Sequence, residues 1–171
     1  MPSLQPAVLR VLSFLGAAVL SVGIAGCSAA VRPSAEEIQY STSGHYACAP
    51  GEPVVLNGHS RSFVLTGSCG AVTVNGEGIR VRLARAASLD IRGDSSSVTV
   101  DSRIGSALVG GDGVMLAADS IGSIMLTGHH NSVTAPALGS VTVQGDRNVV
   151  TTHVKPSDYR VTGRHDTLTL R

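Results

Sequence analysis

Histidines and carboxylates follow regularly spaced glycines along this chain, and both side-chain types can carry chemistry. His129, His130, Asp112 and Asp146 form the strongest set. Imidazole and carboxylate groups are common ligands of divalent metals, and paired carboxylates can hydrolyse glycosidic bonds. Whether these side chains meet depends on the elements that hold them. Residues of similar type follow other glycines of the series: His59, Glu77, Asp94, Arg147, Arg164, His165 and Asp166.

The glycines belong to a repeat of 17 or 18 residues. Apolar residues, except for Ser106 and Thr152, lie two and four positions before each glycine and five and seven positions after it, with mostly polar residues between them. This alternation predicts a short strand on each side of every glycine. The Gly110 unit is one residue short, so Val114 and Leu116 take the second-strand positions there. The seven glycines are Gly58, Gly76, Gly93, Gly110, Gly128, Gly145 and Gly163.

The repeat predicts an all-β fold, a parallel β-solenoid of about seven turns. A unit this short cannot bury its own apolar face, so neighbouring turns must stack, with equivalent residues about 4.8 Å apart. An antiparallel β-sandwich or barrel is the alternative, because Asn75-Gly76 is also typical of a hairpin turn. Four polar residues three positions after a glycine are expected to hydrogen-bond to the backbone of adjacent turns: Ser96, Asn131, Asn148 and Asp166.

Stacking would bring the residues after the glycines into one ridge, with His129 and His130 between Asp112 and Asp146. We expect a solvated ridge of mixed charge, with no catalytic residue, bound metal or cofactor. Two alternatives stay open, a ridge that binds a metal or a glycan and a small glycan-active enzyme. A separate apolar set lies at predicted outward positions and is a candidate for docking a partner: Ala107, Val109, Met115, Ala117 and Met125.

The beginning of the chain predicts export and lipid attachment. Arg10 precedes an uncharged apolar stretch, residues 11–25, which is short for a membrane-spanning helix. The stretch ends in Ile24-Ala25-Gly26-Cys27, which resembles the bacterial lipobox, an aliphatic and two small residues before the cysteine that receives lipid. We therefore predict a lipoprotein signal peptide over residues 1–26. Cys27 would carry the diacylglyceryl and palmitate groups at the extracytoplasmic face of the cell membrane.

The chain after the signal peptide divides into two parts. Residues 27–44 are small and polar and predict a flexible tether, and residues 45–171 form the repeat domain. Without Arg10 the 13 basic residues fall to 12, equal to the 12 acidic ones, so charge gives no case for binding nucleic acid. Cys48 and Cys69 are an even pair in an oxidising compartment, which predicts a disulfide.

Several of these features together resemble actinobacterial lipoproteins of the mycobacterial type with the domain of unknown function numbered 3060. They are the lipobox, the Cys48 and Cys69 pair, and units such as residues 126–133 and 143–150, which follow the family's pattern aliphatic-x-Gly-x-x-Asn-x-Val. The resemblance covers roughly residues 46–171, with the Asn replaced by Ile79, Ser96 and Gly113. It implies a lipid-anchored envelope protein and supplies no activity. We therefore expect a non-enzymatic structural or binding role, with an envelope protein or a glycan as the candidate partner.

Overall fold

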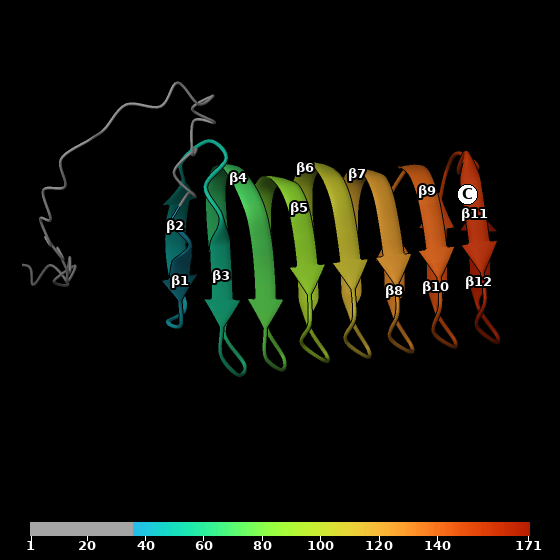
Figure 1. Cartoon of the computed structure of the whole chain (residues 1–171), viewed down its shortest axis with the longest axis horizontal. Coiled ribbons are helices and arrows are strands. Elements are labelled where there is room, and N and C mark those ends of the chain that lie inside the picture. Colours follow the sequence, from blue (N-terminus) through green and yellow to red (C-terminus); the bar gives the residue numbers. More distant parts are fainter. Residues whose placement is uncertain (1–35) are drawn as a thin grey trace, which may run out of the picture. The chain divides into compact units, whose positions relative to one another are not determined.

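The structure is a computed structural model that describes residues 36–171, and every regular element in that range is a β-strand. The strands join into one sheet that coils into a stack of turns (Figure 1). Their bounds are β1 (Ile38–Tyr40), β2 (Gly44–Cys48), β3 (Val54–Asn57), β4 (Ser62–Asn75), β5 (Arg80–Ile91), β6 (Ser97–Val109), β7 (Met115–Leu126), β8 (Ser132–Thr134), β9 (Ala137–Val143), β10 (Val149–Thr152), β11 (Asp158–Val161) and β12 (Thr167–Leu170).

All strand pairs of the described residues are parallel, which confirms the β-solenoid and shows that the antiparallel sandwich or barrel is wrong. Val72 pairs with Leu89, Leu89 with Ala107, and Ala107 with Ile124. Each of these side chains is buried. The near-constant repeat length therefore keeps every inward position above the inward position of the preceding turn.

Each turn has two strands that face each other across the core. A short loop, which we call the corner, joins them, and it contains a glycine in every turn except the first. Face A contains the strands before the corners: β1, β3, the C-terminal parts of β4 to β7, β9 and β11. Face B contains those after the corners: β2, the N-terminal parts of β4 to β7, β8, β10 and β12. These corners form the lower row of loops in Figure 1. At the opposite edge β4 to β7 bend from face B to face A, with a register irregularity in each pairing.

Within residues 36–171 the solenoid begins earlier than predicted and has eight turns rather than seven. Ile38 pairs with Val54 and Tyr40 with Leu56, so β1 lies within the segment that was expected to be a tether up to residue 44. The pairing of β2 with β4 completes this first turn. Its corner, residues 41–43, is shorter than the later corners and has no glycine. An alignment on glycines therefore could not find this turn.

The corner glycine of the fourth aligned repeat is Gly111, and the alignment on Gly110 is wrong by one residue. A Cβ added to Gly111 would collide with the carbonyl oxygen of Gly93, whereas one added to Gly110 would make only ordinary van der Waals contacts. Gly111 thus lies in the stack of corner glycines. The adjacent glycine allowed the wrong alignment, although it left Ser106 at an apolar position and a unit one residue short. Alignment on Gly111 removes both exceptions, because Leu116 and Ala118 then follow the glycine at the regular spacing.

Candidate functional site

The residues directly after the corner glycines form a ladder along one edge of the solenoid. The Asp94 carboxylate accepts the backbone N–H of Asp112 at 2.8 Å, and the Asp112 carboxylate accepts that of His129 at 2.6 Å. Farther along, the Asp146 carboxylate accepts the backbone N–H of Arg164 at 2.8 Å. The stacking of His129 between Asp112 and Asp146 is as predicted. Each of these side chains binds the backbone of the next turn.

His129 is held in one tautomer by this ladder. Its Nδ1 accepts the backbone N–H of Asp146 at 3.0 Å, so the proton of the neutral ring lies on Nε2. The same Nδ1 lies 3.9 Å from a side-chain oxygen of Asp146. Metal binding through Nε2 would move the ring proton to Nδ1 and break the hydrogen bond to the backbone. The arrangement therefore uses His129 as a backbone acceptor.

His130 does not join the ladder. Its side chain is exposed, and its backbone has a φ of 57°, in the left-handed region. No group of three or more His, Cys, Asp or Glu side chains within residues 36–171 is arranged to hold a metal ion. The same left-handed conformation recurs two positions after each corner glycine, although glycine is the residue that adopts it most readily. The other residues with this conformation at that position are Ser60, Gly78, Ser95, Gly113, Arg147 and His165.

A second ladder, which we call the inner ladder, lies inside the corners, three positions after the corner glycines. Asn131 and Asn148 are buried there. The Asn131 Oδ1 accepts the backbone N–H of Val114 at 2.8 Å, the Asn148 Oδ1 accepts that of Asn131 at 2.9 Å, and the Asp166 Oδ1 accepts that of Asn148 at 2.7 Å. The predicted bonds to adjacent turns are therefore present. With the corrected corner glycine, the residue that replaces Asn in its turn is Val114, and the assignment of Gly113 was wrong.

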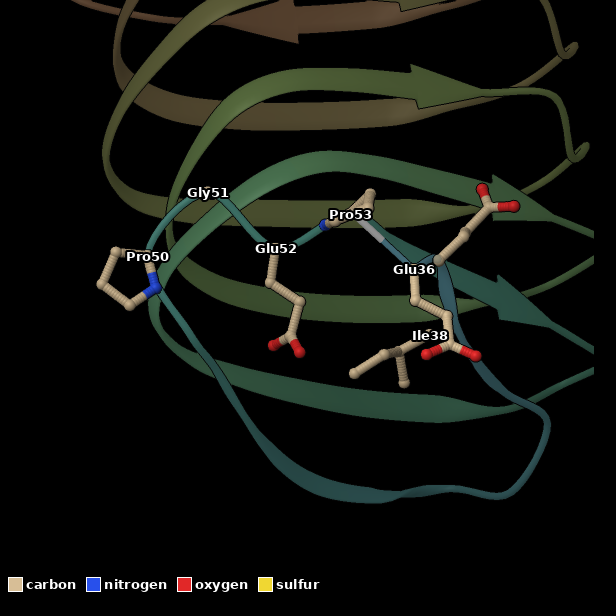
Figure 2. A pocket seen from close by; sticks show the side chains of 7 residues that line it. Glu36, Ile38, Pro50, Gly51, Glu52 and Pro53 are labelled. Carbon is tan, nitrogen blue, oxygen red and sulfur yellow. The ribbon is translucent and has the colours of Figure 1, made fainter. Parts of the chain in front are cut away.

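A recess of about 480 Å³ near the N-terminal end of the solenoid was not predicted from the sequence. Figure 2 shows Glu36 and Glu52 lining it, together with Ile38 and the loop before β3. The Glu52 carboxylate accepts the backbone N–H of Ala49 at 2.8 Å, so one of its oxygens stabilises this loop. The recess brings together residues on both sides of the predicted tether boundary, which is why the sequence did not indicate it.

The predicted apolar docking set is only partly correct. Ala107 and Val109 are buried, because the one-residue shift in their turn exchanges inward and outward positions. Leu108 points outward instead and is 38% exposed. Met115 and Ala117 are exposed on face B, opposite to the face of Met125, as predicted.

A shallow groove of about 510 Å³ crosses face A, and its outward apolar side chains are Leu108 and Met125. These two residues are neighbours in register on β6 and β7. Asp90 and Thr142 flank them in the same outward row. The groove therefore offers methyl groups, a thioether and hydroxyls on one flat surface. The hydroxyls come from a row of serines in register: Ser88, Ser106, Ser123 and Ser140.

The predicted disulfide is present. Cys48 and Cys69 are bonded, with their Cα atoms 5.0 Å apart. Cys48 ends β2 in the first turn, and Cys69 lies in β4, which passes through the second turn. The bond therefore joins the first turn covalently to the next one.

The predicted signal peptide (residues 1–26) and the lipid-attachment residue Cys27 lie outside the described residues, so the structure does not test them. Among residues 36–171, none belongs to a helix of the length and hydropathy that a membrane span requires.

Comparison with known families gives a match over part of the solenoid. Residues 56–103 match the family model described as "Protein of unknown function (DUF3060)". This range includes all of β4 and β5 and less than half of the chain. No curated protein and no solved structure matches the chain. The stretch from residue 56 to residue 103, within the parallel β-solenoid, is thus similar to the domain of unknown function DUF3060.

Proposed function

We propose that this chain is a non-enzymatic protein of the bacterial cell envelope, anchored by lipid on Cys27, that presents its β-solenoid as a rigid binding surface. The solenoid supplies the rigidity, because every turn is hydrogen-bonded to its neighbours over both faces. The partner would be an envelope protein or a glycan. The anchor rests on the sequence motif alone.

The ladder of Asp94, Asp112, His129 and Asp146 is the observation that carries the non-enzymatic proposal. Three of them, Asp112, His129 and Asp146, belong to the set best suited to catalysis or metal binding, and each of the four side chains accepts a backbone N–H from the next turn. Because these acceptors are exposed, each bond contributes less to stability than the value of about 1.5–3 kcal/mol that is typical of a charged acceptor. The ladder therefore supports a structural role for the ridge over the glycan-active or metal-binding alternative.

Face A is the better candidate for the binding surface. Its groove combines Leu108 and Met125 with a row of hydroxyl groups, a mixture of apolar and hydrogen-bonding contacts that suits a protein or carbohydrate surface. On face B the exposed Met115 lies between Ser97 and Ser132, so it has polar residues on both sides in its row. Face A therefore offers the larger continuous apolar surface for a partner to contact.

Photo-crosslinking in intact cells tests this surface. A photoreactive residue in place of Met125 should form a discrete crosslinked product, because Met125 would lie against the partner. The same residue in place of Thr134, which is exposed on face B, is the matched control. Equal crosslinking at both positions, or none at Met125, would contradict binding through face A.

The anchor is tested separately with Cys27→Ala. We expect this change to abolish labelling by a radioactive or clickable fatty acid and to move the protein out of the membrane fraction. Retained labelling would show that the lipobox assignment is wrong, whatever the crosslinking experiment gives.

A further inference from the structure

The two ends of the solenoid are built differently. At the N-terminal end Tyr40 and Tyr46 stack with ring centroids 3.7 Å apart, and Tyr46 lies 6.4 Å from Phe63 in the core. The Tyr46 hydroxyl donates to the carbonyl oxygen of Thr42 at 2.6 Å, which fixes this aromatic cover. Three aromatic side chains thus close the end of the core.

At the other end, the turn made by β11 and β12 exposes its inward side chains. Val161 is 38% exposed and Leu170 is 54% exposed, whereas Val143 and Thr152, the residues that pair with them in the preceding turn, are both 0% exposed. Within residues 36–171 no further turn packs against this one. Apolar side chains that belong to the core therefore face solvent here.

The backbone of the same turn is also unpaired along one edge. The N–H of Thr162 donates to the carbonyl oxygen of Val143, and that of Thr167 donates to the carbonyl oxygen of Asn148. The backbone groups of Thr162 and Thr167 therefore point back toward the preceding turn. Because pairing directions alternate along a strand, the N–H and C=O groups of the inward-facing residues point away from it. These residues are Tyr159 and Val161 on β11 and Leu168 and Leu170 on β12. Such an edge is a template for another strand.

We propose that this open end is the interface of a two-fold symmetric homodimer, in which the last turns of two copies pair antiparallel. A two-fold axis reverses strand direction, so the partner edge is antiparallel by necessity. When Tyr159 lies opposite its counterpart, Asp158 of each copy lies opposite Arg160 of the other. The two residues already attract one another within one copy, at 3.2 Å. The edge is therefore complementary in charge to a second copy of itself.

This self-complementarity favours a second copy over an unrelated strand. The closed aromatic end disfavours head-to-tail stacking, which would need the open end of one copy to pack on the Tyr40 and Tyr46 cover of the next. An interface as small as one turn lies below the typical total of about 1,600 Å². We therefore expect a dissociation constant in the micromolar range, with dimers favoured where an anchored protein is concentrated on a membrane.

Sedimentation velocity of the purified full chain in detergent, over a wide range of protein concentration, tests the proposal. The expected result is a reversible change from monomer to dimer. Asp158→Arg places like charges opposite each other, as does Arg160→Asp, so each variant alone should dimerise roughly tenfold or more weakly. An equimolar mixture of the two variants should dimerise, because each Arg then faces an Asp of the other copy.

The mixture is the decisive measurement, because the ion pair within each copy stays broken and only a contact between copies can restore association. Asp101→Arg, which breaks the ion pair of Arg82 and Asp101 in the middle of the rod, is the control and should leave dimerisation unchanged. A chain that stays monomeric at every concentration overturns the proposal. Species larger than dimers, or a mixture that fails to associate, overturns the two-fold arrangement that is proposed.

Discussion

Asn148 shows how a single side chain serves two turns at once. It is 0% exposed, its Oδ1 accepts the backbone N–H of Asn131, and its Nδ2 donates to the carbonyl oxygen of Gly128 at 3.1 Å. An alanine in its place would leave two buried backbone groups without partners, as well as a small cavity. Residues of this kind are therefore constrained by stability, even though their chemistry could also serve a site.

We predict that Asn148→Ala lowers the free energy of unfolding by about 2–4 kcal/mol, because each unpaired buried group costs about 1–3 kcal/mol. The measurement is equilibrium unfolding in urea. Thr134→Ala, a change at an exposed position of face B, is the control and should stay within about 0.5 kcal/mol of the parent. Equal stability of the two variants would contradict a structural role for the inner ladder.

The tyrosines at the two ends link stability to alkaline pH. Burial raises the pKa of Tyr40, with a further contribution from Glu52, and burial also raises the pKa of Tyr159, followed by Asp166. For a phenol a raised pKa means that folding favours the protonated form. The stabilisation is fully present below the unfolded-state pKa of about 10 and is lost as the pH rises through the folded-state pKa.

We therefore predict that the free energy of unfolding falls as the pH rises above about 10, and that the fall is smaller in the double variant Tyr40→Phe, Tyr159→Phe. Urea unfolding at a series of alkaline pH values measures both slopes. If the parent and the double variant lose stability at the same rate, groups other than these phenols cause the loss.

At the scale of the elements, the glycine corners set how closely the turns approach. A Cβ on most of the corner glycines would meet a carbonyl oxygen of the preceding corner at a distance that real Cβ atoms do not show. The requirement for glycine here is thus steric and comes from the stack, since Gly93, Gly111 and Gly128 are not among the glycines with positive φ.

The pair Gly110 and Gly111 provides a matched test of this steric argument. We predict that Gly111→Ala lowers the melting temperature and costs roughly 1–3 kcal/mol or more, because the added methyl group collides with the backbone of the Gly93 corner. Gly110→Ala should be nearly neutral, since its Cβ would lie 3.6 Å from the Thr127 Oγ1. Thermal unfolding followed by circular dichroism compares the two variants. If Gly110→Ala were the less stable one, Gly110 would be the corner glycine instead of Gly111.

The whole molecule is a stack in which each turn contacts its neighbours, so its stability is approximately a sum over turns and interfaces. Ser120 pairs with Ala137 and Ile121 with Leu138. Removing residues 121–137 therefore joins Ser120 to Leu138 in register. In the shortened chain Asn148 would take the place of Asn131 against the Val114 backbone, so the inner ladder stays continuous.

We predict that this deletion variant folds, with a β-type circular dichroism spectrum and cooperative melting at a somewhat lower temperature. A deletion of residues 121–129 is the control, because it removes half a turn and places face A residues against face B. That control should aggregate or stay unfolded. If both deletions unfold the protein, the turns do not behave as independent, exchangeable units.

The sequence by itself predicted the parallel solenoid ahead of the antiparallel alternative, the inward and outward alternation of most strands, the Cys48–Cys69 bond and the ladder of polar corner residues. These follow from spacing along the chain, because a constant period places equivalent residues one above another. The first turn at Ile38 required the tertiary structure, whereas the regular spacing of Leu116 and Ala118 after Gly111 already favoured that glycine over Gly110. That first turn depends on contacts between turns, because a corner without glycine leaves no periodic signal.

The use of each candidate site residue was likewise decided only by the tertiary structure. The sequence placed His129 near Asp112 and Asp146, but the same three residues could bind a metal, act on a glycan or bind the backbone. The answer lies in which atom each side chain presents to the next turn, a matter of distances near 3 Å that the order of residues does not fix. The sequence likewise did not indicate the open edge of β11 and β12, because the exposure of a turn depends on what packs against it.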